Sequence, residues 1–180
     1  MKNILFTLIL TLTFNCFNYS ALGQKLSSSN LISFINKDFE YINDILIQKN
    51  YTFNGIIEIP WYNSGKQTGS SKEFNWEYNP NSDKSAKFLK FQTLDEETEK
   101  KGTIYPKQIS YTIFSNFEYT EIKNQFIQKG FKKVERKVEK DNDGNDIISV
   151  KYKKYEYSLN IYTLLNGRYQ FDLIRYYIIK

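Results

Sequence analysis

Apolar residues recur at helical spacing in two segments of the chain. They are three or four residues apart, which places them along one face of a helix. The positions are Ile35, Phe39, Ile42 and Leu46 in the first segment, and Tyr119, Ile122 and Phe126 in the second. The segments end alike, with Lys49-Asn50-Tyr51 and Lys129-Gly130-Phe131. Asn and Gly tolerate the left-handed conformation that ends many helices, and the aromatic residue after each can fold back onto the last turn. The sequence therefore predicts two helices that stop in the same way.

The two helical segments also match each other at an offset of 80 residues. Residues 31–51 lie over residues 111–131 and share six identities. The identical pairs are Phe34/Phe114, Asn36/Asn116, Ile42/Ile122, Ile47/Ile127, Gln48/Gln128 and Lys49/Lys129. Self-similarity at a fixed offset indicates an internal repeat. We therefore expect two repeats, at about 30–110 and 111–180.

Strand-like sequence follows each helical segment in similar order. β-Branched and aromatic residues alternate with polar ones between turn residues, which is typical of strands. The expected strands are 52–60, 72–78, 87–94 and 103–114 in the first half, and 131–140, 146–152, 155–165 and 168–179 in the second. The Gly/Ser-rich stretch 63–71 predicts a longer loop, and Asp143-Gly144 a turn. The expected fold class is α+β, a tandem α-β-β-β-β repeat with two helices packed on one face of a largely antiparallel sheet.

The last hairpin carries a turn signal that fixes its register. Asn166-Gly167 between alternating runs predicts a two-residue type I′ turn, which pairs residue 165 with residue 168. Tyr162 and Tyr169 then share one face of the sheet, and Tyr155, Tyr157 and Tyr176 share the other. One layer of helices covers only one face. Either the sheet twists between two core regions, or some of these tyrosines face water or a partner.

These five tyrosines are candidate binding residues, together with Trp61. Tyrosine combines a large apolar area with a polar tip and is enriched at protein interfaces. It is also a good strand former, so the same side chains can belong to the core. Trp61 follows Pro60 at the expected end of a strand, where it is either an interface anchor or a plug at the end of the core.

The N-terminus has the three-part order of a secretory signal peptide. A charged start, an apolar run over residues 4–14 and the small-residue exit Ala21-Leu22-Gly23 predict cleavage before Gln24. The run is shorter than the roughly 20 residues that span a bilayer, and no later segment is apolar enough to do so. In an alternative interpretation the chain is a lipoprotein with a lipid anchor at Cys16. We expect a signal peptide over 1–23 and a single α+β domain over 24–180, periplasmic or secreted.

Several kinds of chemistry are excluded by composition. The sequence has no histidine, and its one cysteine lies before the expected cleavage site. Ser-His-Asp and Cys-His catalysis and histidine-ligated zinc are therefore excluded. Phosphate-cradling glycine motifs are missing as well. We predict no catalytic residue, no metal site and no cofactor.

Two further patterns point away from ligands. Segment 141–146, Asp-Asn-Asp-Gly-Asn-Asp, has the composition of a calcium loop. With Gly144 at the sharp turn, however, Val150 falls where a bidentate carboxylate is required, so a hairpin turn is the better interpretation. The net charge of +5 comes from interspersed lysines and carboxylates, which indicates no nucleic-acid partner.

The order of one helix and four strands, repeated, resembles in outline the secreted β-lactamase-inhibitor proteins. That resemblance implies a concave aromatic sheet face that grips another protein, although the disulfides of that family are missing from the expected mature chain. We expect an exported non-catalytic binding protein, such as an inhibitor, an immunity-type protein or an envelope accessory factor, whose partner is another protein. The alternatives are a small exported hydrolase that uses carboxylates and a self-associating structural envelope protein.

Overall fold

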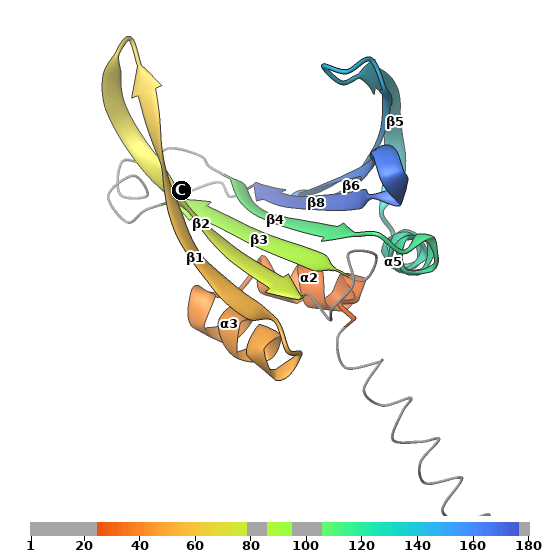
Figure 1. The fold of residues 1–180 in the computed structure, drawn as a ribbon, viewed down its shortest axis with the longest axis horizontal. Coiled ribbons are helices and arrows are strands. Elements are labelled where there is room, and N and C mark those ends of the chain that lie inside the picture. The colour runs from red at the N-terminus through yellow and green to blue at the C-terminus, as the bar shows by residue number, and fades with distance from the viewer. Residues whose placement is uncertain (1–24, 79–85, 95–105, 177–180) are drawn as a thin grey trace, which may run out of the picture.

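The structure is a computed structural model that describes residues 25–78, 86–94 and 106–176. Within these residues, an eight-stranded antiparallel sheet is accompanied by three α-helices (Figure 1). The expected α+β class with a largely antiparallel sheet is confirmed. The predicted signal peptide, its cleavage before Gln24 and the alternative lipid anchor at Cys16 lie outside the described residues.

The strands form two meanders that meet in the middle of the sheet. The first consists of β1 (Thr52–Asn63), β2 (Lys66–Tyr78), β3 (Lys87–Leu94) and β4 (Pro106–Ile113). The second consists of β5 (Lys132–Lys140), β6 (Asp146–Lys154), β7 (Tyr157–Thr163) and β8 (Tyr169–Tyr176). The order across the sheet is β1-β2-β3-β4-β8-β7-β6-β5. The strands β4 and β8 are therefore central neighbours, and β1 and β5 are the edges.

The helices are α2 (Ser28–Phe34), α3 (Phe39–Gln48) and α5 (Asn116–Gln128). The prediction of one continuous helix in the first half is wrong, because the helical conformation is interrupted between the end of α2 at Phe34 and the start of α3 at Phe39. Asp38 is the N-cap of α3 and accepts a hydrogen bond from the backbone N–H of Tyr41 at 3.0 Å. A capping side chain satisfies a donor that the start of a helix leaves unpaired, so the polar residue begins a new helix here.

The two predicted helix stops are confirmed at α3 and α5. Asn50 has φ 61° and Gly130 has φ 89°, both in the left-handed region. The backbone N–H of Tyr51 donates to the carbonyl of Leu46 at 2.9 Å. The backbone N–H of Phe131 donates in the same way to the carbonyl of Phe126 at 3.2 Å. These are the six-to-one hydrogen bonds of the Schellman motif.

All three helices cover the same face of the sheet and form the core with it (Figure 1). Core side chains alternate along the strands, as the period of two requires. The buried hydrophobic residues of the helices are Leu31, Phe34, Ile42, Leu46, Ile122 and Phe126. Those of the central strands include Trp76, Leu89, Phe91, Ile109, Tyr111, Leu159, Ile161, Phe171 and Leu173.

The β1–β2 hairpin is longer than the sequence indicated. Stretch 63–71, predicted as a loop, is mostly strand, and only Ser64 and Gly65 form the turn between Asn63 and Lys66. Both have positive φ, 50° and 78°, as a type I′ turn requires. The Gly/Ser composition argued against a strand, but pairing with β1 overrides that weak preference.

The β7–β8 hairpin differs from the predicted register by one residue. Residues 165–167 form the turn, Leu164 donates its backbone N–H to the carbonyl of Arg168 at 2.8 Å, and Thr163 pairs with Tyr169. The loop therefore has three residues with Gly167 in the left-handed region, φ 70°, instead of the two expected. A slip of one residue turns the side chains of one strand to the other face relative to its partner. Tyr162 and Tyr169 consequently lie on opposite faces.

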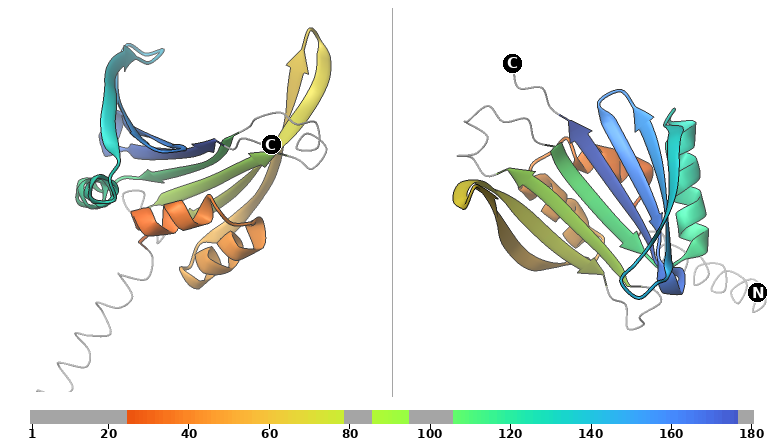
Figure 2. Two further views of the ribbon diagram at one scale, coloured as in Figure 1. Left: turned by 180° about the vertical axis from the view of Figure 1, so that it is seen from behind. Right: turned by 90° about the horizontal axis from the view of Figure 1, so that it is seen from above.

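The sheet curves away from the helices. In Figure 1 the β1–β2 hairpin rises at one end of the sheet and the β5–β6 hairpin at the other. In the right-hand view of Figure 2, which looks onto this side, the helices lie behind or beside the sheet and none crosses in front of it. The face opposite the helices is thus concave and uncovered by the described elements.

Candidate functional site

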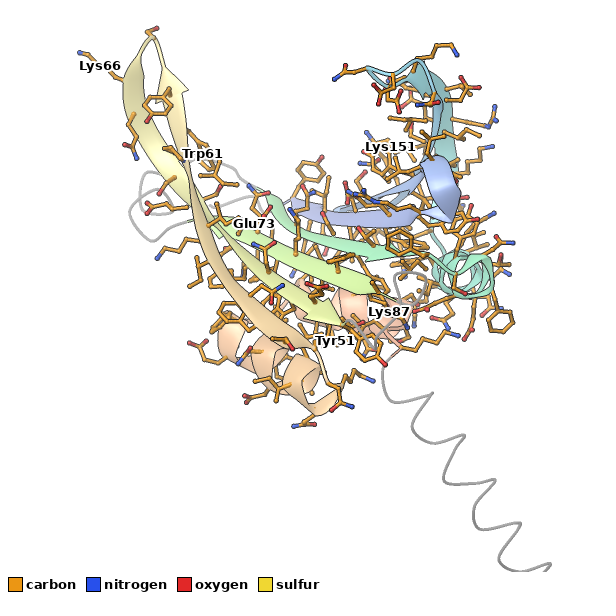
Figure 3. All side chains as sticks on the ribbon, viewed as in Figure 1. Tyr51, Trp61, Lys66, Glu73, Lys87 and Lys151 are labelled. Atoms are coloured by element: carbon orange, nitrogen blue, oxygen red, sulfur yellow. The ribbon has the colours of Figure 1, made fainter. Side chains whose placement is uncertain are left out.

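The concave face is lined mainly by polar side chains, which alternate with the core positions. We call this set the floor. It consists of Glu73, Asn75 and Glu77 on β2, Phe88, Lys90 and Gln92 on β3, Gln108, Ser110 and Thr112 on β4, Gln170, Asp172 and Ile174 on β8, Ser158, Asn160 and Tyr162 on β7, and Ser149 and Lys151 on β6. We call the floor and the two rising hairpins together the trough. Figure 3 labels Glu73 and Lys151 on this side of the sheet, and Tyr51 and Lys87 on the helix side.

One row of directly opposed residues crosses the floor from β2 to β5. In order, it consists of Asn75, Lys90, Ser110, Asp172, Asn160, Lys151 and Glu135. Adjacent members lie on neighbouring strands, about 4.8 Å apart. The row therefore places one carboxylate, Asp172, near the middle of the sheet and a lysine two strands away on each side.

Asp172 is the buried carboxylate of the floor, with only 8% of its surface exposed. The side-chain amide of Gln170 donates to Asp172 Oδ1 at 2.8 Å. Burial raises the pKa of Asp172, because removal from water disfavours the charged form; hydrogen bonds from Gln170 and Ser110 and the charge of Lys90 oppose that rise. Such a group holds its proton to higher pH than an exposed aspartate.

A hollow of about 550 Å³ opens over the floor of the first half. Two pairs of charged and amide side chains in its lining contact each other. Lys90 Nζ lies 3.1 Å from Glu73 Oε1, and the Asn54 side-chain amide donates to Glu77 Oε2 at 3.1 Å. Phe88 adds an aromatic surface to the lining. The hollow is suited to a partner with mixed polar and apolar groups.

A smaller hollow of about 190 Å³ lies over the second half. It is lined by Tyr162, Asn160 and Lys151 and by the β5 residues Glu135 and Lys137, which form an ion pair at 3.4 Å. Burial raises the pKa of Tyr162, and the carboxylates Asp172 and Glu139 raise it further. Tyr162 is therefore a neutral hydroxyl that can donate or accept a hydrogen bond.

The five candidate tyrosines are divided between the two sides of the sheet. Tyr162 lies on the floor, and Tyr176, 48% exposed, is at the end of β8 on the same side. Tyr169 stacks on Tyr119 of α5 with ring centroids 4.3 Å apart. Tyr157 packs against Phe131 and the core on the helix side.

The remaining two candidates lie away from the floor. Tyr155 is 89% exposed in the β6–β7 turn, where it has φ 52°. Trp61 is half-buried on β1 opposite Gly69, in the hairpin that forms one wall of the trough. Sequence reasoning did not single out Asp172, Lys90 or Lys151 as site residues. The alternation of polar residues along the strands was a usable signal for them once the register was known.

The floor carboxylates are widely separated. Glu73 on β2 and Asp172 on β8 are three strand spacings apart, about 14 Å between Cα atoms. Glycosidase carboxyl pairs lie about 5–9.5 Å apart. Across the described ranges, no three of His, Cys, Asp or Glu gather closely enough to hold a metal ion.

Segment 141–145 is the turn between β5 and β6, as its interpretation as a hairpin turn predicted. The Asp141 carboxylate accepts hydrogen bonds from the backbone N–H groups of Asp143 at 3.0 Å and Asn145 at 2.8 Å. None of the helices in the described part of the chain has both the length and the apolar character of a membrane span. Comparison with family models, curated proteins and solved structures gives no match.

Proposed function

We propose that this protein is an exported, non-catalytic binding protein that holds another protein in its trough. The observation that carries the proposal is a concave sheet face, eight strands wide, that no described helix covers (Figure 2). A sheet that packs helices on one face only leaves the other for solvent or a partner. Two rising hairpins flank this face, so a partner can be contacted from three sides.

The chemistry of the floor suits a partner that is also stable by itself. Interfaces between such proteins are about as polar as ordinary surface and contain a few aromatic anchors. On the floor the aromatic residues are Phe88 and Tyr162, set among amides, hydroxyls and charges. We therefore place the binding energy at Tyr162 and Phe88, with Tyr176 and Trp61 at the margins, instead of on a face made mainly of tyrosine.

The edges of the sheet disfavour the alternative of self-association by strand pairing. Strand β5 has seven charged residues among its nine. Strand β1 contains Pro60 and has register shifts at Phe53/Gly55 and Trp61/Tyr62. Charges, proline and bulges are the devices by which natural sheets prevent edge-to-edge pairing.

We further propose that the two halves are tandem repeats. The offset match in sequence supports this, as do the equivalent helix stops at Asn50 and Gly130. The mirrored strand order supports it too, because two copies of a four-strand meander meet at β4 and β8. The first half contains the additional helix α2, which an insertion or loss after duplication explains.

The test is capture of a partner by the immobilised exported protein, followed by titration calorimetry with floor variants. Tyr162→Ala should reduce the binding free energy for the captured partner by about 2 kcal/mol or more if Tyr162 is an anchor. Tyr155→Ala is the matched control, because Tyr155 is exposed on a turn and contributes no side chain to the floor. Equal affinities for the wild type, Tyr162→Ala and Phe88→Ala would reject the trough as the binding site.

A further inference from the structure

Asp172 is a buried carboxylate that forms no ion pair with any of the described residues. The hydrogen-bond partners that the structure gives it, Gln170 and Ser110, are neutral. The ion pairs among the described residues involve other carboxylates. Buried carboxylates are ordinarily paired, because an isolated buried charge costs several kcal/mol. The position is thus incomplete in the free protein.

The two lysines of the row, Lys90 and Lys151, form no ion pair with Asp172. Lys90 Nζ lies 3.1 Å from Glu73 and is thereby directed toward β2, away from β8. Lys151 lies two strands from Asp172, about 10 Å between Cα atoms, with Asn160 between them. Space above Asp172 is left by its two direct neighbours, since Ser110 and Asn160 have short side chains.

A partner in the trough makes this arrangement more costly unless it brings a positive charge. Covering the floor removes the remaining water from Asp172, and the penalty for the unpaired charge rises. A cation from the partner converts that penalty into a charge-assisted hydrogen bond. The row offers more than one acceptor, because Ser110, Asp172 and Asn160 lie side by side on neighbouring strands and each carries a side-chain oxygen. An arginine, with five donors in a planar fork, uses several acceptors at once.

We propose that Asp172, with Ser110 and Asn160, forms a subsite that receives a basic side chain, preferably arginine, from the protein held in the trough. This inference rests on the proposed function and adds the charge of the partner at the centre of its interface. Asp172 lies between the two hollows, because its neighbour Ser110 lines the first and its neighbour Asn160 lines the second. A segment crossing both hollows therefore passes over Asp172.

The first experiment needs no knowledge of the partner. N-acetyl-arginine amide is titrated into the labelled protein while NMR follows the Asp172 carboxyl carbon. The neutral isostere N-acetyl-citrulline amide is the matched ligand control. We expect a saturable shift at Asp172, Ser110 and Asn160 with the arginine derivative only, lost in Asp172→Asn and kept in Asp143→Asn, which changes an exposed aspartate. Equal shifts with both ligands, or none at Asp172, would overturn the inference.

A second variant covers the case in which Asp172→Asn does not fold. Ser110→Lys places a cation from the protein itself opposite Asp172. It should weaken binding of N-acetyl-arginine amide at least tenfold. Retained binding in folded Ser110→Lys overturns the inference.

The captured partner separates this inference from the proposed function. If Tyr162→Ala and Asp172→Asn each weaken binding of the captured partner at least tenfold, both the proposed function and the cation subsite stand. If only Tyr162→Ala does so, the trough binds a protein and the cation subsite is wrong. If only Asp172→Asn does so, the trough binds a protein through the cation subsite and Tyr162 is not an anchor. If neither these two variants nor Phe88→Ala weakens binding, both proposals are wrong.

Discussion

Tyr111 donates its phenolic hydrogen to Glu118 Oε1 over 3.0 Å, and both side chains are buried between the sheet and α5. Lys87 Nζ lies 3.0 Å from the other carboxylate oxygen, and the hydroxyl of Tyr51 lies 3.3 Å from that of Tyr111. Burial raises the pKa of Tyr111 well above its ordinary value of 10.0, so it remains a donor. This network joins the end of α3, two central strands and α5, and so connects the two halves.

Removal of the cation from this network should cost more than removal of the hydroxyl. Lys87→Met leaves Glu118 charged and buried, which costs about 3 kcal/mol. Tyr111→Phe leaves the Glu118–Lys87 pair intact and costs about 1–2 kcal/mol. Urea unfolding measures both. Lys90→Met is the control, because the exposed pair with Glu73 contributes less than about 1 kcal/mol. If Lys87→Met is no worse than Lys90→Met, the buried charge does not need its partner.

The two helix stops should respond differently to substitution. Gly130→Ala places a side chain at φ 89°, and the added Cβ meets only Lys154 Cε at 3.9 Å. The cost is therefore conformational, about 1–2 kcal/mol. Asn50→Gly relieves a non-glycine residue at φ 61° and should be neutral or slightly stabilising. Thermal melts of the two variants test this, and a Gly130→Ala protein as stable as the wild type would contradict it.

Local signals in the sequence predicted the helix ends and most strands. The prediction for 87–94 matches β3 residue for residue, because alternation and flanking turns agree there. The Asn50 and Gly130 stops were readable because the left-handed conformation is strongly restricted by residue type. The break at Asp38 was missed because the apolar spacing from Ile35 to Leu46 continues across it.

The candidate site was less readable than the fold. Its floor depends on pairing between strands far apart in sequence, such as β4 with β8, which no local pattern encodes. Asn166-Gly167 predicted a hairpin correctly, but the same two residues fit a two-residue or a three-residue turn. That one-residue difference decided which tyrosines face the trough.

The observed register predicts opposite roles for Tyr162 and Tyr169. Tyr169→Ala removes a ring that stacks on Tyr119 and packs against the core. It should cost about 2–3 kcal/mol of stability. Tyr162→Ala removes a ring from the open floor and should cost about 1 kcal/mol or less. Thermal melts beside Tyr155→Ala, which is expected to be neutral, provide the scale. Similar losses for Tyr162→Ala and Tyr169→Ala would support the two-residue turn instead, because that register places both tyrosines on one face of the sheet.

Stability as a function of pH should reveal the unpaired charge of Asp172. Its folded-state pKa is raised above the ordinary 3.8, chiefly by burial, so the folded protein binds this proton more tightly than the unfolded chain. Stability from this group is therefore complete below about pH 3.8 and is lost as the pH rises through the folded-state value. Besides Gln170 and Ser110, the groups around it are Lys90, Lys151 and Tyr162, none within ion-pair distance.

Asp172→Asn cannot ionise, so its stability relative to the wild type should increase between pH 3 and neutrality and then level off. Asp141→Asn is the control of opposite sign. Hydrogen bonds from the backbone of Asn145, first among several causes, lower the pKa of Asp141 below 3.8. Its contribution is present above that pH and lost as the pH falls, so Asp141→Asn should lose stability relative to the wild type as the pH rises over the same range. Melts of the three proteins at each pH decide the matter, since parallel curves for the two variants would mean that Asp172 carries no uncompensated charge in the folded protein.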